Sequence, residues 1–275
     1  AALAGTTYPI DRSVTCELLG FEAISGNSLD GVSDRDFAIE FCAAASLAMM
    51  HLSRFSEELV LWTSAQFNFI ALPDRFCTGS SIMPQKRNPV PLEHLRLKLS
   101  LAGGGADQIV QTMHNTPFAD MNDSERETQA AGFEVFDRLD HALPLLASFV
   151  EAMKINQQSI NERIQKSMAT ITELADTIVR IEKIAFRPAH HVASKLARVA
   201  LSRGICFDEL PWDLFAQTFE EVIGRKPVMD NALLTKATSP QNFVAVREMP
   251  GGPGPGALRQ SLDGYAGRLA NLEAK

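Results

Sequence analysis

The segment TGSSIMPQKRNP, residues 78–89, gathers side chains that could do chemistry between two prolines, Pro84 and Pro89. We expect the prolines to anchor a loop whose tip is mobile, with Gly79 giving backbone freedom directly before Ser80. A serine is a poor base unless its pKa is lowered, and a cation within a few ångströms favours the ionised form. Lys86 is the nearest candidate cation. The segment thus offers a base and a charge to activate it.

The same segment also carries groups that could bind a carboxylate. Lys86 supplies a point charge, and Ser81 and Asn88 supply directed hydrogen-bond donors. Such a set suits the removal of a proton beside a carboxylate, because the cation and donors stabilise the aci-carboxylate as its second charge forms. A mobile loop could close over the substrate and exclude water. The alternative interpretation is an ordinary polar surface loop.

Long helices flank this segment. Apolar residues recur every three or four positions from Ser33 to about Asn68, which predicts a helix of roughly 50 Å, and a shorter helix is predicted from Ser13 to about Gly26. A second long helix is predicted from Pro91 through Ile109, with glycines 103–105 inside it. Three glycines cost a helix about 1 kcal/mol each relative to alanine, which is tolerable if neighbouring helices pack very close.

A third long helix is predicted from about Ser124 to Lys154, interrupted by Pro144, and strand-like alternation is nearly absent. The last third has shorter helical patterns separated by Gly and Pro, a loop of low periodicity at residues 238–256, and a final helix from about Ala257 to Ala274. We therefore predict an all-α protein. Residues 1–163 would form part of a long-helix bundle that carries the mobile loop, and residues 164–275 a small helical C-terminal domain.

Composition narrows the function classes. With 275 residues and 45% apolar content, the chain can bury a sizeable core. A net charge of −7 without a long basic run argues against nucleic acid as a partner. The four cysteines are scattered without metal-ligand spacing, which fits reduced thiols. No membrane-length apolar run or signal peptide is visible, so we predict a cytoplasmic protein without membrane contact.

Other motifs carry less information. A phosphate-binding GxxxxGK[ST] loop is excluded because Gly79 has no second glycine before the lysine. Asp30 and residues 34–36 (DRD) are interpreted as a helix cap with an ion-pair cluster, since they lack the calcium-loop order. His190 and His191 are consecutive and face different sides of a helix, so we interpret them as a buried or interface pair. We expect no metal and no cofactor.

The segment GSSIMPQKRNP closely resembles the signature of the fumarase/aspartase superfamily, whose members release fumarate by β-elimination. The run NSLDGVSDRDFAIEF and Gln85 resemble its argininosuccinate lyase family in particular, and the crystallins related to it. Collinear similarity continues through ALAGTTYPIDR, ITELADTIVR, FRPAHHVASKL and GGPGP. The resemblance therefore spans nearly the whole chain.

The resemblance implies a role for each matching residue. The first serine of the family's loop is the catalytic base, which corresponds to Ser80. Ser81, Lys86 and Asn88 correspond to the groups that bind the carboxylates of the fumarate part, and Glu93 in PLEHLR corresponds to the glutamate that orients the family's catalytic histidine. The resemblance also implies a homotetramer with a core of twenty long helices, in which three subunits build each active site around a small dicarboxylate substrate.

This sequence departs from the family's pattern in two ways, one concerning how much of the enzyme it contains and the other concerning the substrate. The family's Thr-His and Ser-Arg-Asn-Asp motifs do not occur here, and the chain opens without Met, so we expect it to be a C-terminal portion that cannot complete an active site alone. The family's segment that recognises the arginine part carries Tyr, Gln and Lys. Here Pro117 or Phe118, Asn122, and Glu125 or Arg126 fall at those positions, and Val90 replaces an acidic residue.

These observations leave three candidate functions. The first is a carbon–nitrogen lyase that splits an N-substituted aspartate into fumarate and an amine, with argininosuccinate as the first candidate and Asn122 and Arg126 as substrate-binding residues. The second is the same elimination with another amine, which the altered segment favours because unpaired polar groups cost about 1–3 kcal/mol each. The third is a non-catalytic, crystallin-like helical protein, against which the retained loop counts.

Overall fold

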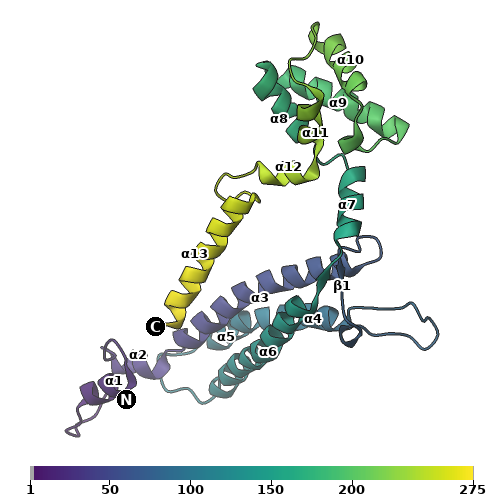
Figure 1. Ribbon diagram of the computed structural model, residues 1–275. Coiled ribbons are helices and arrows are strands. Elements are labelled where there is room, and N and C mark those ends of the chain that lie inside the picture. The colour runs from purple at the N-terminus through teal and green to yellow at the C-terminus, as the bar shows by residue number, and fades with distance from the viewer. Residues whose placement is uncertain (1–2, 275) are drawn as a thin grey trace. The chain divides into compact units, whose positions relative to one another are not determined.

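The regular structure of the protein is almost entirely helical in a computed structural model that describes residues 3–274 (Figure 1). Two strands of two residues each are the exceptions in that range. The predicted all-α class, with long helices followed by a smaller helical domain, is confirmed. The chain divides into two compact units, Ala1–Asn156 and Gln157–Lys275, whereas the boundary predicted from sequence, near Arg163, lies inside a helix.

Unit 1 is a bundle of long helices. Helix α3 packs along α4 and α5, and α6 packs against both of these. One buried cluster at the end of the bundle near the loop includes Leu59, Leu95 and Phe149, and a second cluster includes Ile109 and Val135. The helices are α1 (Arg12–Leu19), α2 (Ser28–Ser33), α3 (Asp36–Thr63), α4 (Val90–Gly103), α5 (Gly105–Met113) and α6 (Glu125–Ala152), with a 3₁₀ turn, η1 (Asp74–Phe76).

Helix ends in unit 1 differ from the prediction where turn geometry intervenes. The first predicted helix does not reach Gly26, because Gly20 adopts a left-handed conformation (φ 71°) and ends α1. Helix α3 spans 28 residues, about 42 Å, rather than about 35 residues. It begins at Asp36, whose N–H donates to the Asp34 carboxylate (2.8 Å), and it ends where Ser64 becomes extended.

The predicted helix through the glycine triplet is two helices. Gly104 ends α4 and precedes α5, so the expectation of one continuous helix was wrong at that residue. Close packing does explain Gly105, since a Cβ there would lie 2.1 Å from Val135 Cγ2 on α6. The expected interruption at Pro144 was also wrong, because α6 continues through it despite the missing amide donor.

A two-stranded antiparallel sheet joins the start of the loop to the end of α6. Strand β1 (Ile70–Ala71) pairs with β2 (Lys154–Ile155), which follows α6 directly. The Phe76 ring also lies 4.7 Å from the ring of Phe149, near the C-terminal end of α6. The C-terminal end of α6 and the base of the loop therefore lie at the same end of unit 1.

Unit 2 has its own apolar core. Leu174, Ile178, Leu196, Phe215 and Phe219 are fully buried in one cluster. Helix α12 forms inside the predicted loop of low periodicity, so that loop begins later than expected. The elements are α7 (Gln157–Lys166), α8 (Ile171–Glu182), α9 (Phe186–Arg203), η2 (Phe207–Glu209), α10 (Trp212–Ile223), α11 (Asn231–Thr238), α12 (Pro240–Ala245) and α13 (Pro255–Glu273).

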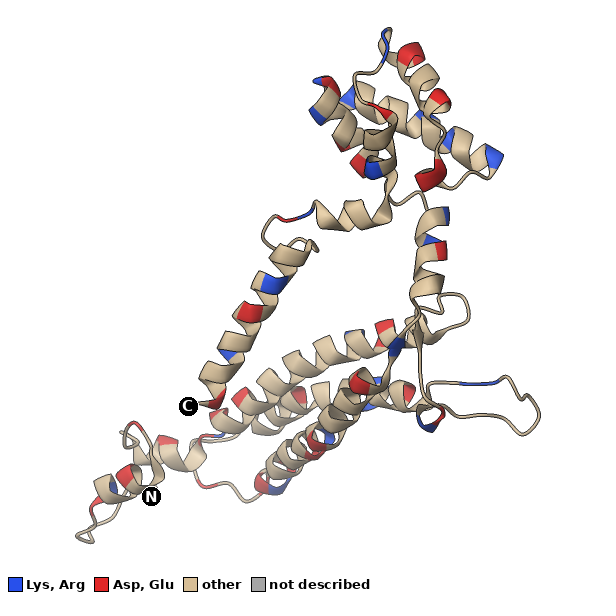
Figure 2. Ribbon diagram, in the orientation of Figure 1, with Lys and Arg blue, Asp and Glu red and all other residues tan. Residues whose placement is uncertain are grey.

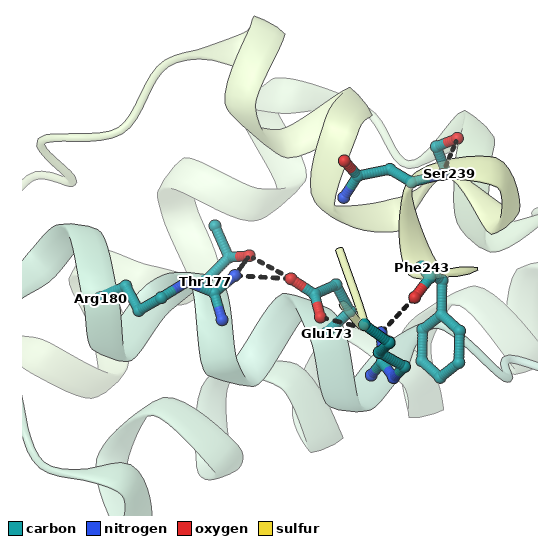
Figure 3. Close-up of polar contacts among 7 residues, drawn as sticks. Glu173, Thr177, Arg180, Ser239 and Phe243 are labelled. Carbon is teal, nitrogen blue, oxygen red and sulfur yellow. Dashed lines mark hydrogen bonds and ion pairs between the residues drawn. The ribbon is translucent and has the colours of Figure 1, made fainter. Parts of the chain in front are cut away.

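A buried carboxylate links α8 to the segment after α12 (Figure 3). The side chain of Glu173 is 3% exposed and accepts hydrogen bonds from Arg180 (2.5 Å), Thr177 (3.2 Å) and Arg247 (3.2 Å). The Arg247 guanidinium also lies 3.4 Å from the centroid of the Phe243 ring. Because a buried charge is costly unless it is paired, this cluster fixes the segment that leads into α13.

Candidate active site

The proposed catalytic segment is a long loop that projects from unit 1 between β1 and α4 (Figure 1). Its two limbs meet where the Thr78 N–H donates to the Asn88 carbonyl (2.9 Å) and the Asn88 N–H donates to the Thr78 carbonyl (3.1 Å). This bridge closes the loop, so the expectation that Pro84 anchors it was wrong. Pro84 is exposed and lies within a turn in which the Lys86 N–H donates to the Met83 carbonyl.

Ser80 is half-buried, and its hydroxyl oxygen receives two backbone N–H donors. The distances are 3.1 Å from the Ile82 amide and 3.2 Å from the Met83 amide. Hydrogen bonds to an ionised oxygen stabilise it relative to the neutral hydroxyl. The sequence analysis assigned this role to Lys86, but within residues 3–274 no hydrogen bond or ion pair joins Lys86 to Ser80. The amides following Ser80 are the groups that could support an alkoxide.

The other loop residues lie close to the same stem. Asn88 is half-buried and pairs with Thr78, and residues directly opposite each other in an antiparallel pair place their side chains on one face. Lys86 and Ser81 are exposed on the loop. Glu93 is half-buried in the first turn of α4, and its carboxylate has no hydrogen-bond or ion-pair partner in the described part of the chain.

Asn122 and Arg126 lie elsewhere. Asn122 precedes α6 and Arg126 occupies its first turn, and both are exposed. The C-terminal end of α6 joins the sheet at the loop base, and its 28 residues span about 42 Å. Asn122 and Arg126 are therefore at the opposite end of unit 1 from Ser80 (Figure 1). One copy of the chain does not bring the predicted site residues together.

The acidic cluster near α3 is a cap without the predicted ion pairs. Arg35 donates to the carbonyls of Val32 (3.1 Å) and Asp34 (2.6 Å) rather than to a carboxylate. Repulsion from the Asp34 charge, with smaller effects from Asp30 and Glu40, raises the pKa of Asp36. The ion-pair part of the interpretation was therefore wrong.

Charges of both signs are interspersed along the helices of both units (Figure 2). Among the described residues, no three His, Cys, Asp or Glu side chains lie close enough together to hold a metal ion. His190 lies with its ring 5.8 Å from that of Phe186. No helix in residues 3–274 combines the length and the apolar character needed to cross a membrane.

Sequence reasoning found the loop but missed the groups that hold it. The Ile82 and Met83 amides are invisible to a search by side-chain type, although a serine followed by a turn is a known signal for such bonds. Cys77, directly before the loop, packs against the buried cluster at the loop base.

Two family models match the chain: one described as "Lyase" over residues 1–104, and one described as "Argininosuccinate lyase C-terminal" over residues 168–245. The argininosuccinate lyases of Stutzerimonas stutzeri (strain A1501) and Azotobacter vinelandii (strain DJ / ATCC BAA-1303) are 48% and 47% identical to it. Each alignment covers 95% of this chain and 54% of the relative. The chain thus spans about half the length of these curated relatives.

Solved structures agree with the sequence relatives. An EDDS lyase variant with bound fumarate matches with a TM-score of 0.79 at 26% identity, over 100% of this chain and 54% of that chain. The similarity again covers about half of the larger protein. Sequence and structure together show that the chain is similar to argininosuccinate lyases and to solved lyases of the fumarase/aspartase superfamily, and that its residues 168–245 match the model of the argininosuccinate lyase C-terminal segment.

Proposed function

We propose that the protein containing this chain is a carbon–nitrogen lyase that releases fumarate from an N-substituted aspartate, with argininosuccinate as the first candidate. The observation that carries the proposal is the Ser80 hydroxyl, held by two backbone amides on a loop whose return limb presents Lys86 and Asn88. The similarity to argininosuccinate lyases over 95% of the chain supports it.

The proposed reaction is a β-elimination. Ser80, as the alkoxide, takes a proton from the carbon that bears the side-chain carboxylate, and the electron pair moves into that carboxylate to form the aci-carboxylate. The pair then returns to form the carbon–carbon double bond as the bond between the neighbouring carbon and nitrogen breaks. Fumarate and a free amine are the products, and the amine takes up a proton on leaving.

Lys86, Asn88 and Ser81 would bind the carboxylates of the substrate. Lys86 contributes a positive charge where negative charge develops, and the Asn88 amide and Ser81 hydroxyl donate directed hydrogen bonds. Glu93 would orient a histidine supplied from outside this chain, which fits a half-buried carboxylate that has no partner of its own in residues 3–274.

The proposal includes a homotetramer with active sites shared between subunits. Ser80 and the pair Asn122 and Arg126 lie at opposite ends of unit 1, so only different copies can bring them to one substrate. The bundle also exposes large apolar side chains that another copy could cover. They include Phe37 (70%), Leu47 (61%), Leu97 (53%), Phe133 (68%) and Phe136 (56%).

The identity of the amine released with fumarate has a second candidate. The solved EDDS lyase that matches this chain points to an N-substituted aspartate other than argininosuccinate. The exposed segment around Asn122 and Arg126 also lacks the Tyr, Gln and Lys expected for a guanidinium site. We propose argininosuccinate first, because the similar argininosuccinate lyases are nearly twice as identical in sequence.

The deciding experiment measures fumarate release by ultraviolet absorbance from the full-length protein. In parallel assays, the protein receives as substrate argininosuccinate, an ethylenediamine-linked N-substituted aspartate or an amino-acid-linked N-substituted aspartate. Release from argininosuccinate supports the first candidate, and release only from another member supports the second. A folded tetramer that releases fumarate from none of them would favour the non-catalytic alternative. A cytoplasmic location stays a prediction, which fractionation of the native cells would test.

A further inference from the structure

Arg87 lies between the two residues proposed to bind carboxylates, Lys86 and Asn88, yet its side chain makes contacts of a different kind. Its Nη2 donates to the Leu72 carbonyl (2.8 Å) and lies 2.6 Å from Oδ1 of Asp74. Both partners belong to the outgoing side of the loop base. Arg87 therefore ties the return limb to the segment that precedes the loop.

The segment that Arg87 grips is fixed to the body of unit 1. Leu72 and Phe76 are each 8% exposed and belong to the buried cluster at the loop base, and Cys77 packs against that cluster. A cavity of about 230 Å³ at the base is lined by residues that include Cys77 and Arg87. The outgoing limb is thus held by apolar burial, whereas the return limb is held by the Thr78–Asn88 bridge and by Arg87.

The direction of Arg87 constrains its neighbours. Successive side chains of an extended backbone point to opposite faces, and the bridge to Thr78 makes the backbone extended at Asn88, directly after Arg87. Asn88 has both its backbone N–H and its carbonyl bonded to Thr78. Arg87 is turned toward Leu72 and Asp74, and it lies directly between Lys86, which ends a turn, and Asn88, which is bridged to Thr78.

We propose that Arg87 is a positioning residue that orients Lys86 and Asn88 toward the substrate carboxylate by clamping the return limb to Leu72 and Asp74. The inference rests on the proposed function and deepens it. The two contacts contribute unequally, because the Asp74 side chain is 89% exposed and its attraction is screened by water and salt. The bond to the carbonyl of the buried Leu72 is the larger part of the clamp.

The test compares Arg87→Met, Arg87→Lys and Asp74→Asn in the full-length protein. Arg87→Met keeps an unbranched side chain and removes both contacts. Backbone hydrogen exchange at the Thr78 and Asn88 amides should accelerate about tenfold, and KM should rise about tenfold with a smaller change in kcat. Arg87→Lys should recover part of both effects, and Asp74→Asn should change each about twofold.

Arg96→Met is the matched control. Arg96 forms an exposed ion pair with Glu57 (2.5 Å) in the same unit, with 47% and 43% side-chain exposure, and within residues 3–274 no hydrogen bond or ion pair joins its side chain to the loop. It should leave exchange at Thr78 and Asn88 unchanged.

Two results would overturn the inference: unchanged exchange in Arg87→Met, or accelerated exchange with unaltered KM and kcat in a protein that releases fumarate. If the wild-type protein releases no fumarate from any substrate tested, the proposed function fails, and the exchange result alone decides whether Arg87 clamps the loop.

Discussion

Two arginines in this chain tie a connecting segment to the helices, and they do so with opposite degrees of burial. Arg87 holds the return limb of the loop through the Leu72 carbonyl and through the Asp74 carboxylate, whose side chain is 89% exposed. Arg247 holds the segment before α13 through Glu173, which is 3% exposed, and stacks on Phe243. The chemistry is similar, but water screens the first contact and not the second.

The difference in burial between the two carboxylates indicates a different role for each segment. A weak, solvated clamp lets the tip of the loop open and close while its base keeps one orientation, as a gating loop requires. A buried carboxylate shared by two arginines leaves no low-energy alternative, because any separation strands a charge away from water. Changes in the loop should therefore alter chemistry, and changes in the Glu173 cluster should alter stability.

Ser80→Ala should give the largest effect in the molecule. Without the proposed base, kcat should fall about a thousandfold. The free energy of unfolding should stay unchanged, since the Ile82 and Met83 amides can bond to water in the exposed loop. Fumarate release and urea unfolding of the same preparation measure both quantities.

Ser81→Ala is the matched control for that variant, because it removes the neighbouring hydroxyl from the same loop. We expect a raised KM with a smaller loss of kcat. The reverse pattern, with Ser81→Ala losing more of kcat than Ser80→Ala, would show that Ser81 and not Ser80 is the base.

In contrast to Ser80→Ala, Glu173→Gln should lower the stability of the protein and leave its kcat nearly unchanged. It removes the charge that Arg180 and Arg247 share, so unit 2 should lose about 2–3 kcal/mol of stability, while kcat per folded molecule stays near wild type. Fluorescence of Trp212 reports urea unfolding of unit 2 when Trp62, and any tryptophan outside these 275 residues, is replaced by Phe.

Lys195→Met provides the control for Glu173→Gln, because Lys195 and Glu221 form an exposed pair in the same unit. The stability lost in Lys195→Met should be much smaller than that lost in Glu173→Gln, because water and salt screen the exposed pair. Equal losses in the two variants would show that burial of Glu173 adds nothing to the strength of its contacts.

Substitutions of two glycines, Gly252 and Gly79, should distinguish the same two segments by a smaller change in stability. A Cβ at Gly252 would lie 2.2 Å from the Arg247 carbonyl oxygen, so Gly252→Ala should destabilise unit 2 by about 1–2 kcal/mol. A Cβ at Gly79 would lie 3.7 Å from the nearest atom, the Lys86 carbonyl oxygen, which is ordinary contact. Gly79→Ala should keep stability and lower kcat only if the loop needs that backbone freedom. Unfolding and turnover of both variants separate these outcomes.

The sequence was sufficient for the helices but not for every helix end. Spacing of apolar residues located α3, α4 and α6, because one buried face repeats every three or four residues over many turns. The ends at Gly20 and Gly104 depend on the conformation of a single residue, which the apolar pattern does not encode.

The candidate site was predictable only in part, for a similar reason. Residue types identified the loop, yet the amides that surround the Ser80 oxygen have no side-chain signature. The separation of Arg126 from Ser80 was also hidden, because it depends on which end of a helix about 42 Å long meets the loop. The number of residues between Ser80 and Arg126 does not tell which end of the helix meets the loop.

Asp36 offers the smallest test of how exposed charges behave in this molecule. Its pKa is raised chiefly by the Asp34 charge, so the protonated form is favoured in the folded state. Any stability linked to Asp36 is therefore greatest at low pH and is lost as the pH rises through its folded pKa. Carbon-detected NMR titration should place the Asp36 pKa above 3.8, and Asp34→Asn should bring it back toward that value, since Asn keeps the cap to the Asp36 amide without the charge. An unshifted Asp36 in the wild type would mean that solvent screens even neighbouring carboxylates at this helix start, and Arg87 would then have to hold the return limb through the Leu72 carbonyl alone, without the exposed Asp74.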